Sequence, residues 1–327
     1  MLSRAAEMAD IIIEEGKEVR VFAPATVANV ACGYDVLGFA VDAPGDEVLV
    51  RFGKGKPGLC ITRITGDEGR LPFEATENTA GVAALELLAH LDQEELSIEM
   101  EIHKKMPFGS GMGSSAASSV AGAFAVNQLL GAPLKKEALM PFVLSGEARA
   151  DGAWHADNVG PSLMGGLVFI RNNEEVDFMA LPVPDGLWAA VVHPDIEVLT
   201  KTAREILPES LPLGDVTRQV GNLGALIVAC YENDLELLSR SLQDVVAEPY
   251  RKQLIPGFEE ARRAAMDAGA LGFSISGAGP SVFALCAGEE RAQAAAAGVA
   301  QVFRRREISS QIHVSPVNRE GVRELQS

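Results

Sequence analysis

A glycine- and serine-rich run at residues 107–117 has the spacing expected of an anion site. Three glycines alternate with other residues, and a serine cluster and a helical pattern follow directly. Glycine permits positive φ angles and close approach of the backbone to a ligand. The free N–H groups of a helix N-terminus attract negative charge. The run therefore predicts a phosphate site made by Pro107, Phe108, Gly109, Ser110, Gly111, Met112, Gly113, Ser114, Ser115, Ala116 and Ala117.

This loop differs from a Walker A loop, because no lysine follows its last glycine. A cation would have to come from Lys104 or Lys105, which precede the loop. We expect Ser114 to be the N-cap of the helix and Ser115 to offer its hydroxyl to phosphate or Mg²⁺. The alternative is a flexible strand-to-helix turn with a helix of small residues packed closely behind it.

The elements that would position the loop are an alternating strand at 96–102 and a helix at 114–130, ended by Gly131. Further strands are expected at 19–22 (stopped by Pro24), 47–52, 59–64, 165–171, 188–192, 272–276, 281–286 and 308–315. Further helices are expected at 78–91, 135–150 (with a kink or broken start at Pro141), 215–230, 234–246, 257–268 and 289–304. The mixture indicates an α+β protein with two domains.

The clearest linker is the Pro- and Gly-containing segment 182–186. It predicts a first domain over residues 17–184 and a second over 185–327, after a helical or frayed extension at 1–16. The run Gly53–Gly58 formally matches GxGxxG, but Pro57 interrupts it and strand-like residues follow. A dinucleotide site needs a helix there, so we interpret the run as a hairpin turn.

Composition limits the classes of partner. The 327 residues are 47% hydrophobic and 22% charged, as in a globular protein, and the net charge is −17. That excess of acid argues against nucleic acid and anionic membranes as main partners. The short apolar run at 11–13 is flanked by acidic residues and does not read as a signal peptide or membrane span. Scattered thiols at Cys32, Cys60, Cys230 and Cys286 favour a reducing, cytoplasmic location.

Three ordered motifs resemble the GHMP kinases. The loop is similar to their P-x-G-S-G-L-G-S-S-A pattern, with Met112 in place of the usual Leu. The segments 23–42 and 274–281 resemble the family's N- and C-terminal motifs. The resemblance implies a two-domain GHMP kinase fold, with an N-terminal domain like ribosomal protein S5 and a C-terminal ferredoxin-like α/β sandwich. It also implies a kinase that uses ATP and Mg²⁺.

Within the family, four stretches resemble the homoserine kinases most. They contain Asn29 and Asp35; Glu147 with His155 and Asn158; Thr200 and Arg204; and Arg251. One departure is Ala31-Cys32, where family members commonly carry Gly-Pro. The implied reaction is ATP-dependent phosphorylation of the side-chain hydroxyl of L-homoserine, a step of threonine biosynthesis.

The resemblance also implies roles for residues. Asn29 and Asp35 would lie near the substrate ammonium and hydroxyl, and the guanidinium groups of Arg204 and Arg251 would hold its carboxylate. Thr200 and His155 would form a polar wall, and Gly277 would lie in a substrate- or phosphate-side turn, with a tight strand connection as the alternative. Ser115 and Glu147 would be Mg²⁺ ligands, Lys104 would contact phosphate, and Asn78 would lie on the nucleotide side.

The expected mechanism has no strong general base. Asn158 stands where other members of the family use an Asp, and an amide does not accept a proton usefully near pH 7. Positioning and charge stabilisation would then dominate. The adjacent carboxylate, Asp157, is the possible exception.

Three alternatives stay open. The first is phosphorylation of another small molecule such as mevalonate, shikimate or a sugar, although two arginines favour a carboxylate-bearing substrate. The second is a non-catalytic relative that only senses a ligand. Taken singly, Arg204, Arg251 and Glu147 also fit solvated helix faces. A homodimer is a further expectation.

Overall fold

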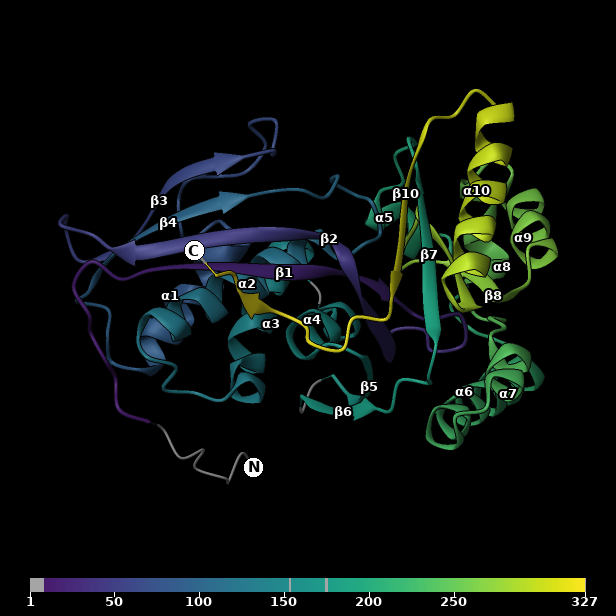
Figure 1. Ribbon diagram of the computed structural model, residues 1–327, viewed down its shortest axis with the longest axis horizontal. Coiled ribbons are helices and arrows are strands. Elements are labelled where there is room, and N and C mark those ends of the chain that lie inside the picture. Colours follow the sequence, from purple (N-terminus) through teal and green to yellow (C-terminus); the bar gives the residue numbers. More distant parts are fainter. Residues whose placement is uncertain (1–8, 153, 174–175, 327) are drawn as a thin grey trace.

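The computed structural model describes residues 9–152, 154–173 and 176–326. Within these residues the chain forms two sheets, each covered by helices, that stand side by side (Figure 1). The expected α+β architecture is confirmed.

The first sheet has seven strands in the described part of the chain. Strands β11, β1, β2, β4 and β3 follow one another, while β5 pairs with the start of β2 and β6 pairs with β5. Their bounds are β1 (Glu18–Ala28), β2 (Leu37–Phe52), β3 (Gly58–Thr65), β4 (Ser97–His103), β5 (Leu167–Asn172), β6 (Asp177–Leu181) and β11 (Arg323–Glu324). As its alternation predicts, β4 buries one face through Ile98, Met100 and Ile102.

One face of this sheet is covered by α1 (Thr79–His90), α2 (Ser114–Leu129), α3 (Met140–Asp151) and α4 (Ala156–Met164) (Figure 1). Helix α2 is the central one and is buried along almost its whole length. A Cβ atom added at Gly122 would lie 2.3 Å from the Ala80 carbonyl oxygen of α1. The small residues of α2 therefore allow close helix packing, as the alternative interpretation of the loop assumed.

The second sheet has the order β10-β7-β9-β8 and is antiparallel throughout. It comprises β7 (Leu187–Pro194), β8 (Ala270–Ile275), β9 (Val282–Ala287) and β10 (Ser310–Pro316). The helices of this region are α5 (Thr200–Glu205), α6 (Leu213–Glu232), α7 (Leu235–Ser241), α8 (Glu248–Arg251), α9 (Phe258–Asp267) and α10 (Glu289–Arg305). Figure 1 shows α9 and α10 stacked on the sheet, and α6 and α7 together at the periphery of the molecule.

Several expected boundaries are wrong. Strand β1 runs on past Pro24, because the register shifts there and a proline at a bulge does not interrupt the ladder. Strand β2 starts at Leu37, ten residues before the expected strand. The turn at residues 53–57 does not close a hairpin, because β4 lies between β2 and β3. Helix α7 ends at Ser241, five residues early.

The broken start of the helix near Pro141 is confirmed: a 3₁₀ turn, Lys136–Leu139, precedes α3. Residues 9–16 are not helical, and the amides of Ala9 and Ile12 bond instead to the carbonyls of Pro133 and Leu130. The rest of the expected extension, residues 1–8, lies outside the described residues. Four short elements and one longer helix were not expected: β6, β11, α5, α8 and α4.

The expected division near residue 184 falls between β6 and β7, the last strand of the first region and the first of the second sheet. Strand β11 crosses this division, because it lies after residue 184 in the sequence but belongs to the first sheet. It pairs with β1, so the chain returns to the first sheet after β10 (Figure 1). The division into 17–184 and 185–327 stays a prediction.

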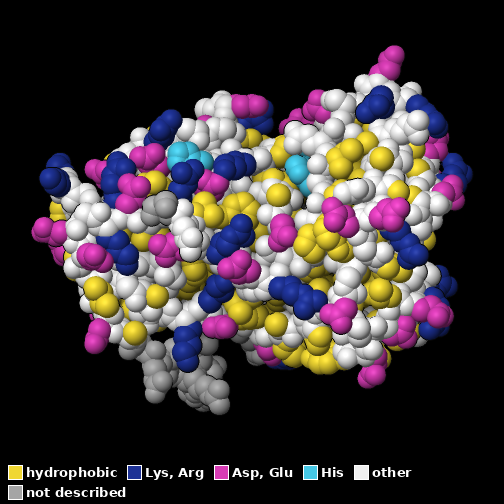
Figure 2. All heavy atoms as spheres, viewed as in Figure 1, with side chains coloured by type: hydrophobic (Ala, Val, Ile, Leu, Met, Phe, Trp, Pro, Cys, Tyr) yellow, Lys and Arg dark blue, Asp and Glu magenta, His cyan; other side chains and the backbone are white. Residues whose placement is uncertain are grey.

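The surface mixes charges. On the face shown in Figure 2, acidic and basic side chains are interspersed outside the grey atoms. The four cysteines are unpaired, and three of them are buried. None of the described helices combines the length and apolar character needed to cross a membrane.

Candidate active site

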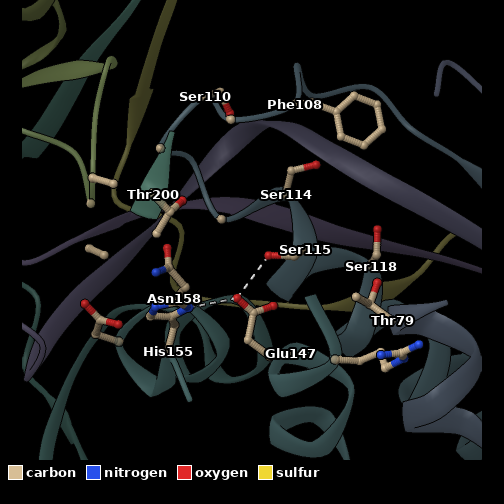
Figure 3. A pocket seen from close by; sticks show the side chains of 18 of the residues that line it. Thr79, Phe108, Ser110, Ser114, Ser115, Ser118, Glu147, His155, Asn158 and Thr200 are labelled. Atoms are coloured by element: carbon tan, nitrogen blue, oxygen red, sulfur yellow. Dashed lines mark hydrogen bonds and ion pairs between the residues drawn. The ribbon is translucent and has the colours of Figure 1, made fainter. Parts of the chain in front are cut away.

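A cavity of about 390 Å³ lies where the two regions meet. The first region contributes the loop before α2, the facing ends of α3 and α4, and the segment before α1; the second contributes α5, Arg251 and the turn at 277–279. Figure 3 shows that Ser115, Glu147, His155, Asn158 and Thr200 come together in this cavity.

The loop adopts the backbone that the glycine pattern predicts. Gly109, Gly111 and Gly113 have φ angles of 60°, 72° and 67°. The expectation that Ser114 is the N-cap is wrong: Gly113 caps α2 in a left-handed conformation, without a side-chain hydrogen bond. The amide of Ala117 donates to the Gly113 carbonyl oxygen at 2.9 Å. The amides before it have no intrahelical acceptor, which is the arrangement that binds an anion.

The loop carbonyls are held from outside the cavity. Ser276 Oγ donates to the Gly111 oxygen at 2.6 Å, the Thr26 amide to the Met112 oxygen at 3.0 Å, and the Ser281 amide to the Ser110 oxygen at 3.3 Å. Both regions of the protein therefore fix the loop. Ser110 Oγ is buried and has no hydrogen-bond partner among the described residues, so it is available to a ligand.

Lys104 is buried at the base of the loop. Its ammonium forms an ion pair with Asp46 and donates to the Ser114 carbonyl oxygen at 2.9 Å and to Ser118 Oγ at 2.7 Å. These three acceptors match the three protons of an ammonium group. Lys104 therefore adds positive charge beneath the first turn of α2, and a direct contact with a phosphate would require it to exchange a partner.

Glu147 projects from α3 to the start of α2. Its Oε1 accepts from Ser115 Oγ at 3.0 Å and lies 3.3 Å from Nδ1 of His155 (Figure 3). Its Oε2 is buried without a hydrogen-bond partner in the described structure. Burial of an unpaired carboxylate oxygen is unfavourable, so this atom marks a place for a cation.

The opposite wall begins with the loop 29–35. Asn29 Nδ2 donates to the Gly277 carbonyl oxygen at 2.9 Å, and Asn29 Oδ1 accepts from the Asp35 amide at 2.9 Å. Asn29, Val30 and Ala31 all have positive φ, at 70°, 40° and 57°. Such a run of left-handed residues is strained and occurs mainly at functional sites. Ala31 thus adopts a conformation that suits glycine, which bears on the departure from the family pattern.

The two arginines differ in setting. Arg251 is buried; Nε donates to the Ala203 oxygen at 2.9 Å, Nη1 to the Gly277 oxygen at 3.0 Å, and its guanidinium lies 5.2 Å from the ring centre of Tyr34. Arg204 is exposed, with Nη2 3.2 Å from Nε2 of His155. Arg251 is therefore fixed in place, whereas Arg204 lies at the mouth.

Asn158 lies beside the loop. Its Oδ1 accepts from Thr26 Oγ1 at 2.8 Å, which orients the amide. Asp157 is buried next to it, and burial raises the pKa of this carboxyl to about 7, with a smaller contribution from Asp35. The backbone amide of Asn29 opposes the shift. Asp157 is thus the carboxyl near the site whose protonation state changes near neutral pH.

Most of the expected site residues line the cavity, but four do not: Pro107, Met112, Ala116 and Ala117. Met112, Ala116 and Ala117 are buried behind the loop and shape it by packing. Asn78 lines the cavity but also caps α1, accepting from the Ala80 amide at 3.1 Å.

Sequence reasoning missed the residues that hold the site in place: Thr26, Asp46, Ser118 and Ser276. Thr26 and Ser276 lie inside the motif segments 23–42 and 274–281, and Asp46 and Ser118 lie in a strand and a helix interior. No local pattern indicates the distant contact that each of them makes. Among the described residues no three His, Cys, Asp or Glu side chains cluster as a metal site.

Two family models match this chain: the GHMP kinases N terminal domain over residues 78–166 and the GHMP kinases C terminal over residues 226–305. The chain belongs to the GHMP kinase family, and its fold is the two-domain fold of that family. The expected resemblance and fold class are confirmed.

Similar proteins indicate which members of the GHMP kinase family this chain resembles most. A homoserine kinase of Chlorobium phaeovibrioides is 45% identical over 319 residues, which are 94% of this chain and 100% of the relative. The crystal structure of homoserine kinase from Cytophaga hutchinsonii is 50% identical, with a TM-score of 0.93 over 97% of this chain and 100% of that one. The L. major mevalonate kinase, at 18% identity and a TM-score of 0.70 over 95% and 99%, shares the fold. Within the family, the similarity is to homoserine kinases.

Proposed function

We propose that this chain is a homoserine kinase, which transfers the γ-phosphoryl group of ATP to the side-chain hydroxyl of L-homoserine. The observation that supports it most is a single cavity with a phosphate loop at one end and a fixed arginine and carboxylates at the other. The product, O-phospho-L-homoserine, serves threonine biosynthesis.

The phosphate end would hold ATP through backbone amides. Consecutive N–H groups of the loop and the start of α2 suit the phosphate oxygens, and Ser110 Oγ adds a donor. The Lys104 ammonium lies beneath the first turn of α2 and offsets negative charge without leaving Asp46. Charge that develops on the phosphoryl oxygens would be stabilised by donors already in place.

The residues present fit a Mg²⁺ ion. Glu147 Oε2 lacks a hydrogen-bond partner within the described part of the chain, and Ser115 Oγ lies next to the other oxygen of the same carboxylate. Mg²⁺ commonly takes only one or two protein carboxylates and completes its shell with phosphate oxygens and water, so a cluster of three acids is not needed. We propose Glu147 and Ser115 as its protein ligands; the ion supplies charge neutralisation to the phosphates when bound.

The other end suits an amino acid. Arg251 offers a planar, buried guanidinium to the carboxylate, and Arg204 lies at the mouth for the same group. Asp35 and Asn29 would receive the ammonium, and His155 and Thr200 complete the wall. A substrate without an ammonium leaves Asp35 unpaired, which disfavours mevalonate and shikimate.

The chemistry would proceed by positioning. Asn158, oriented by Thr26, would align the attacking hydroxyl without removing its proton. Asp157 is mostly protonated below pH 7 by its raised pKa, so it is a poor base under acidic conditions. A loose phosphoryl-transfer transition state has little need of a strong base.

The function is tested by assay of the full chain with ATP and Mg²⁺ against homoserine, mevalonate, shikimate and a hexose. We expect phosphate transfer to homoserine alone, and turnover of another acceptor instead would reject the proposal. Glu147→Gln keeps the shape of the side chain but removes its charge, so we expect a loss of about 1,000-fold in kcat. If added Mg²⁺ restored full kcat, Glu147 would not be the essential ligand.

A further inference from the structure

A buried glutamine joins the two walls of the amino-acid end from behind the cavity. Gln219 lies on α6, is 8% exposed and is not one of the residues that line the cavity. Its Nε2 donates to the Cys32 carbonyl oxygen at 3.0 Å and to Asp244 Oδ1 at 3.1 Å, and its Oε1 accepts from the Val245 amide at 2.9 Å. Both amide protons and the amide oxygen are thus used, which fixes the side chain in one orientation.

The contact with Cys32 reaches the wall that would receive the substrate ammonium. Cys32 belongs to the loop 29–35, whose two ends, Asn29 and Asp35, line the cavity. Two internal hydrogen bonds brace this loop: the Gly33 amide donates to the Asn29 carbonyl oxygen at 2.8 Å, and the Asp35 amide donates to Asn29 Oδ1 at 2.9 Å. A shift of the Cys32 carbonyl would therefore move both lining residues.

The other two contacts reach the segment that ends in Arg251. Asp244 accepts hydrogen bonds from backbone amides at the start of this segment, from Val246 at 2.7 Å and from Glu248 at 2.8 Å. Within the same turn, the Arg251 amide donates to the Ala247 carbonyl oxygen at 3.0 Å. The glutamine on α6 thus holds the short helix α8, which carries the arginine of the opposite wall.

We propose that Gln219 is a positioning residue that sets the distance between the ammonium site and the carboxylate site. This role rests on the proposed function, in which Asp35 and Arg251 hold the two charged groups of L-homoserine. In an α-amino acid both groups are attached to one carbon atom, so the substrate fixes their separation. The two walls come from different regions of the chain, and their spacing has to match that separation.

A second link between the walls lies inside the cavity. The Gly277 carbonyl oxygen accepts from Asn29 Nδ2 at 2.9 Å and from Arg251 Nη1 at 3.0 Å. One link alone would let the walls pivot about it, whereas a second link behind the cavity fixes their orientation as well. Binding groups that are already in place cost less to order when the substrate binds. Loss of the link through Gln219 should therefore weaken homoserine binding and leave the phosphate loop unchanged.

The first test is steady-state kinetics of Gln219→Glu in the full chain, with homoserine and ATP varied in turn. The new carboxylate keeps the shape of the side chain, but it cannot donate to the Cys32 oxygen and it repels Asp244. We expect KM for homoserine to rise about 30-fold, with kcat and KM for ATP within about 3-fold of wild type. Gln219→Met removes the donors without adding a charge and should give the same split, which covers the case that Gln219→Glu does not fold.

The matched control is Asn222→Asp, about one turn further along α6. Asn222 Nδ2 donates to the Gln243 carbonyl oxygen at 3.1 Å, so this change also replaces an amide with a carboxylate beside the segment that leads to α8. That bond does not reach the loop 29–35. We therefore expect KM for homoserine to stay within about 2-fold of wild type.

A substrate analogue distinguishes positioning from a general loosening of the fold. The analogue has one methylene more than homoserine between the ammonium-bearing carbon and the carboxylate, and its inhibition constant is measured against homoserine. The ratio of this constant to KM for homoserine should be about 100 in wild type and about 10-fold smaller in Gln219→Met, because the walls no longer enforce one separation. A purely structural defect would weaken both ligands by the same factor.

The outcomes separate this role from the proposed function. If wild type phosphorylates homoserine but both Gln219 variants keep its KM, or lose homoserine and the analogue equally, Gln219 does not position the walls and the proposed function stands. A wild type that does not phosphorylate homoserine would overturn both.

Discussion

The two ends of the cavity are built in opposite ways. The proposed phosphate loop is one continuous run whose donors would be mainly backbone N–H groups, and its shape depends on glycines with positive φ. The amino-acid end collects side chains from distant segments: Asn29 bonds to Gly277 across 248 residues of sequence. Substitutions should therefore act on the loop through backbone geometry and on the other end through side-chain chemistry.

The loop also depends on one pair of side chains, which lies beneath it. Asp46 and Lys104 have 0% and 2% exposed side chains, so neither can be removed without leaving a charge buried. Lys104→Met should reduce the free energy of unfolding by about 3–5 kcal/mol, measured by urea denaturation. The double variant Asp46→Asn with Lys104→Met should be less destabilised, because no charge remains.

The same variant decides the role of Lys104. If the Lys104 ammonium stays paired with Asp46 when ATP binds, Lys104→Met should mainly lower the free energy of unfolding. The ATP affinity of the protein that remains folded should then change less. A Lys104→Met enzyme of normal stability whose KM for ATP rises about 100-fold would mean that Lys104 exchanges partners and contacts the nucleotide.

At the amino-acid end, Asp157 predicts a pH effect. Its pKa is raised from 3.8 to about 7 in the folded chain, so the folded state keeps a proton that the unfolded state releases. The contribution of Asp157 to stability therefore falls as pH rises from about 4 to about 7, by an upper limit of about 4 kcal/mol.

Asp157→Asn should remove this fall. The unfolding free energy of the variant minus that of wild type, measured at pH 4, 5.5 and 7, should become more positive with pH. A difference that is constant across the range would show that Asp157 does not titrate there.

A pair of glycine variants sharpens the backbone half of the comparison. A Cβ at Gly111 would lie 2.5 Å from the Ser276 oxygen and 2.7 Å from the Gly279 oxygen, whereas one at Gly109 has only the Val198 oxygen, at 3.9 Å. Both positions have positive φ, so both alanine variants share that strain. We expect KM for ATP to rise about 100-fold in Gly111→Ala and much less in Gly109→Ala. If steady-state kinetics gave the same rise in KM for ATP in both variants, the strain of the positive φ angle alone would account for it.

The smallest effect expected is at the arginines. Arg251→Lys keeps the charge but loses the fork that bonds the Ala203 and Gly277 oxygens, and KM for homoserine should rise about 10-fold with little change in KM for ATP. Arg204→Lys, at an exposed position, should change KM less. A larger effect for Arg204 would place the carboxylate at the mouth of the cavity.

The sequence predicted the loop well because its residues are contiguous and each glycine has a local conformational reason. It predicted the wrong N-cap for α2, since Gly113 in a left-handed conformation takes the place that Ser114 was expected to fill. The predicted strand at 47–52 was too short because Pro44 and Gly45 interrupt the pattern of β2. The first residues of β2 nevertheless pair with both β1 and β5.

The sequence could not predict which residues contact the site residues. Asp46 meets Lys104 across 58 positions, and Thr26 meets Asn158 across 132. Such pairs are created by strand order and helix packing, which no local pattern encodes. Asn29, Asp35 and Arg251 were identified through the resemblance. Only the three-dimensional structure shows that Asn29 and Arg251 both donate to the Gly277 oxygen and that the Asp35 amide donates to Asn29.

The pairing of β11 with β1 has a consequence for synthesis. Residues 21–22 leave the ribosome some three hundred residues before their partners, Arg323 and Glu324. Until then the outer edge of β1 has no strand beside it, and such an edge is open to pairing with other chains. The edge of β1 is thus covered only after both regions have been translated, and a nascent chain depends on β11, or on a chaperone, to cover that edge.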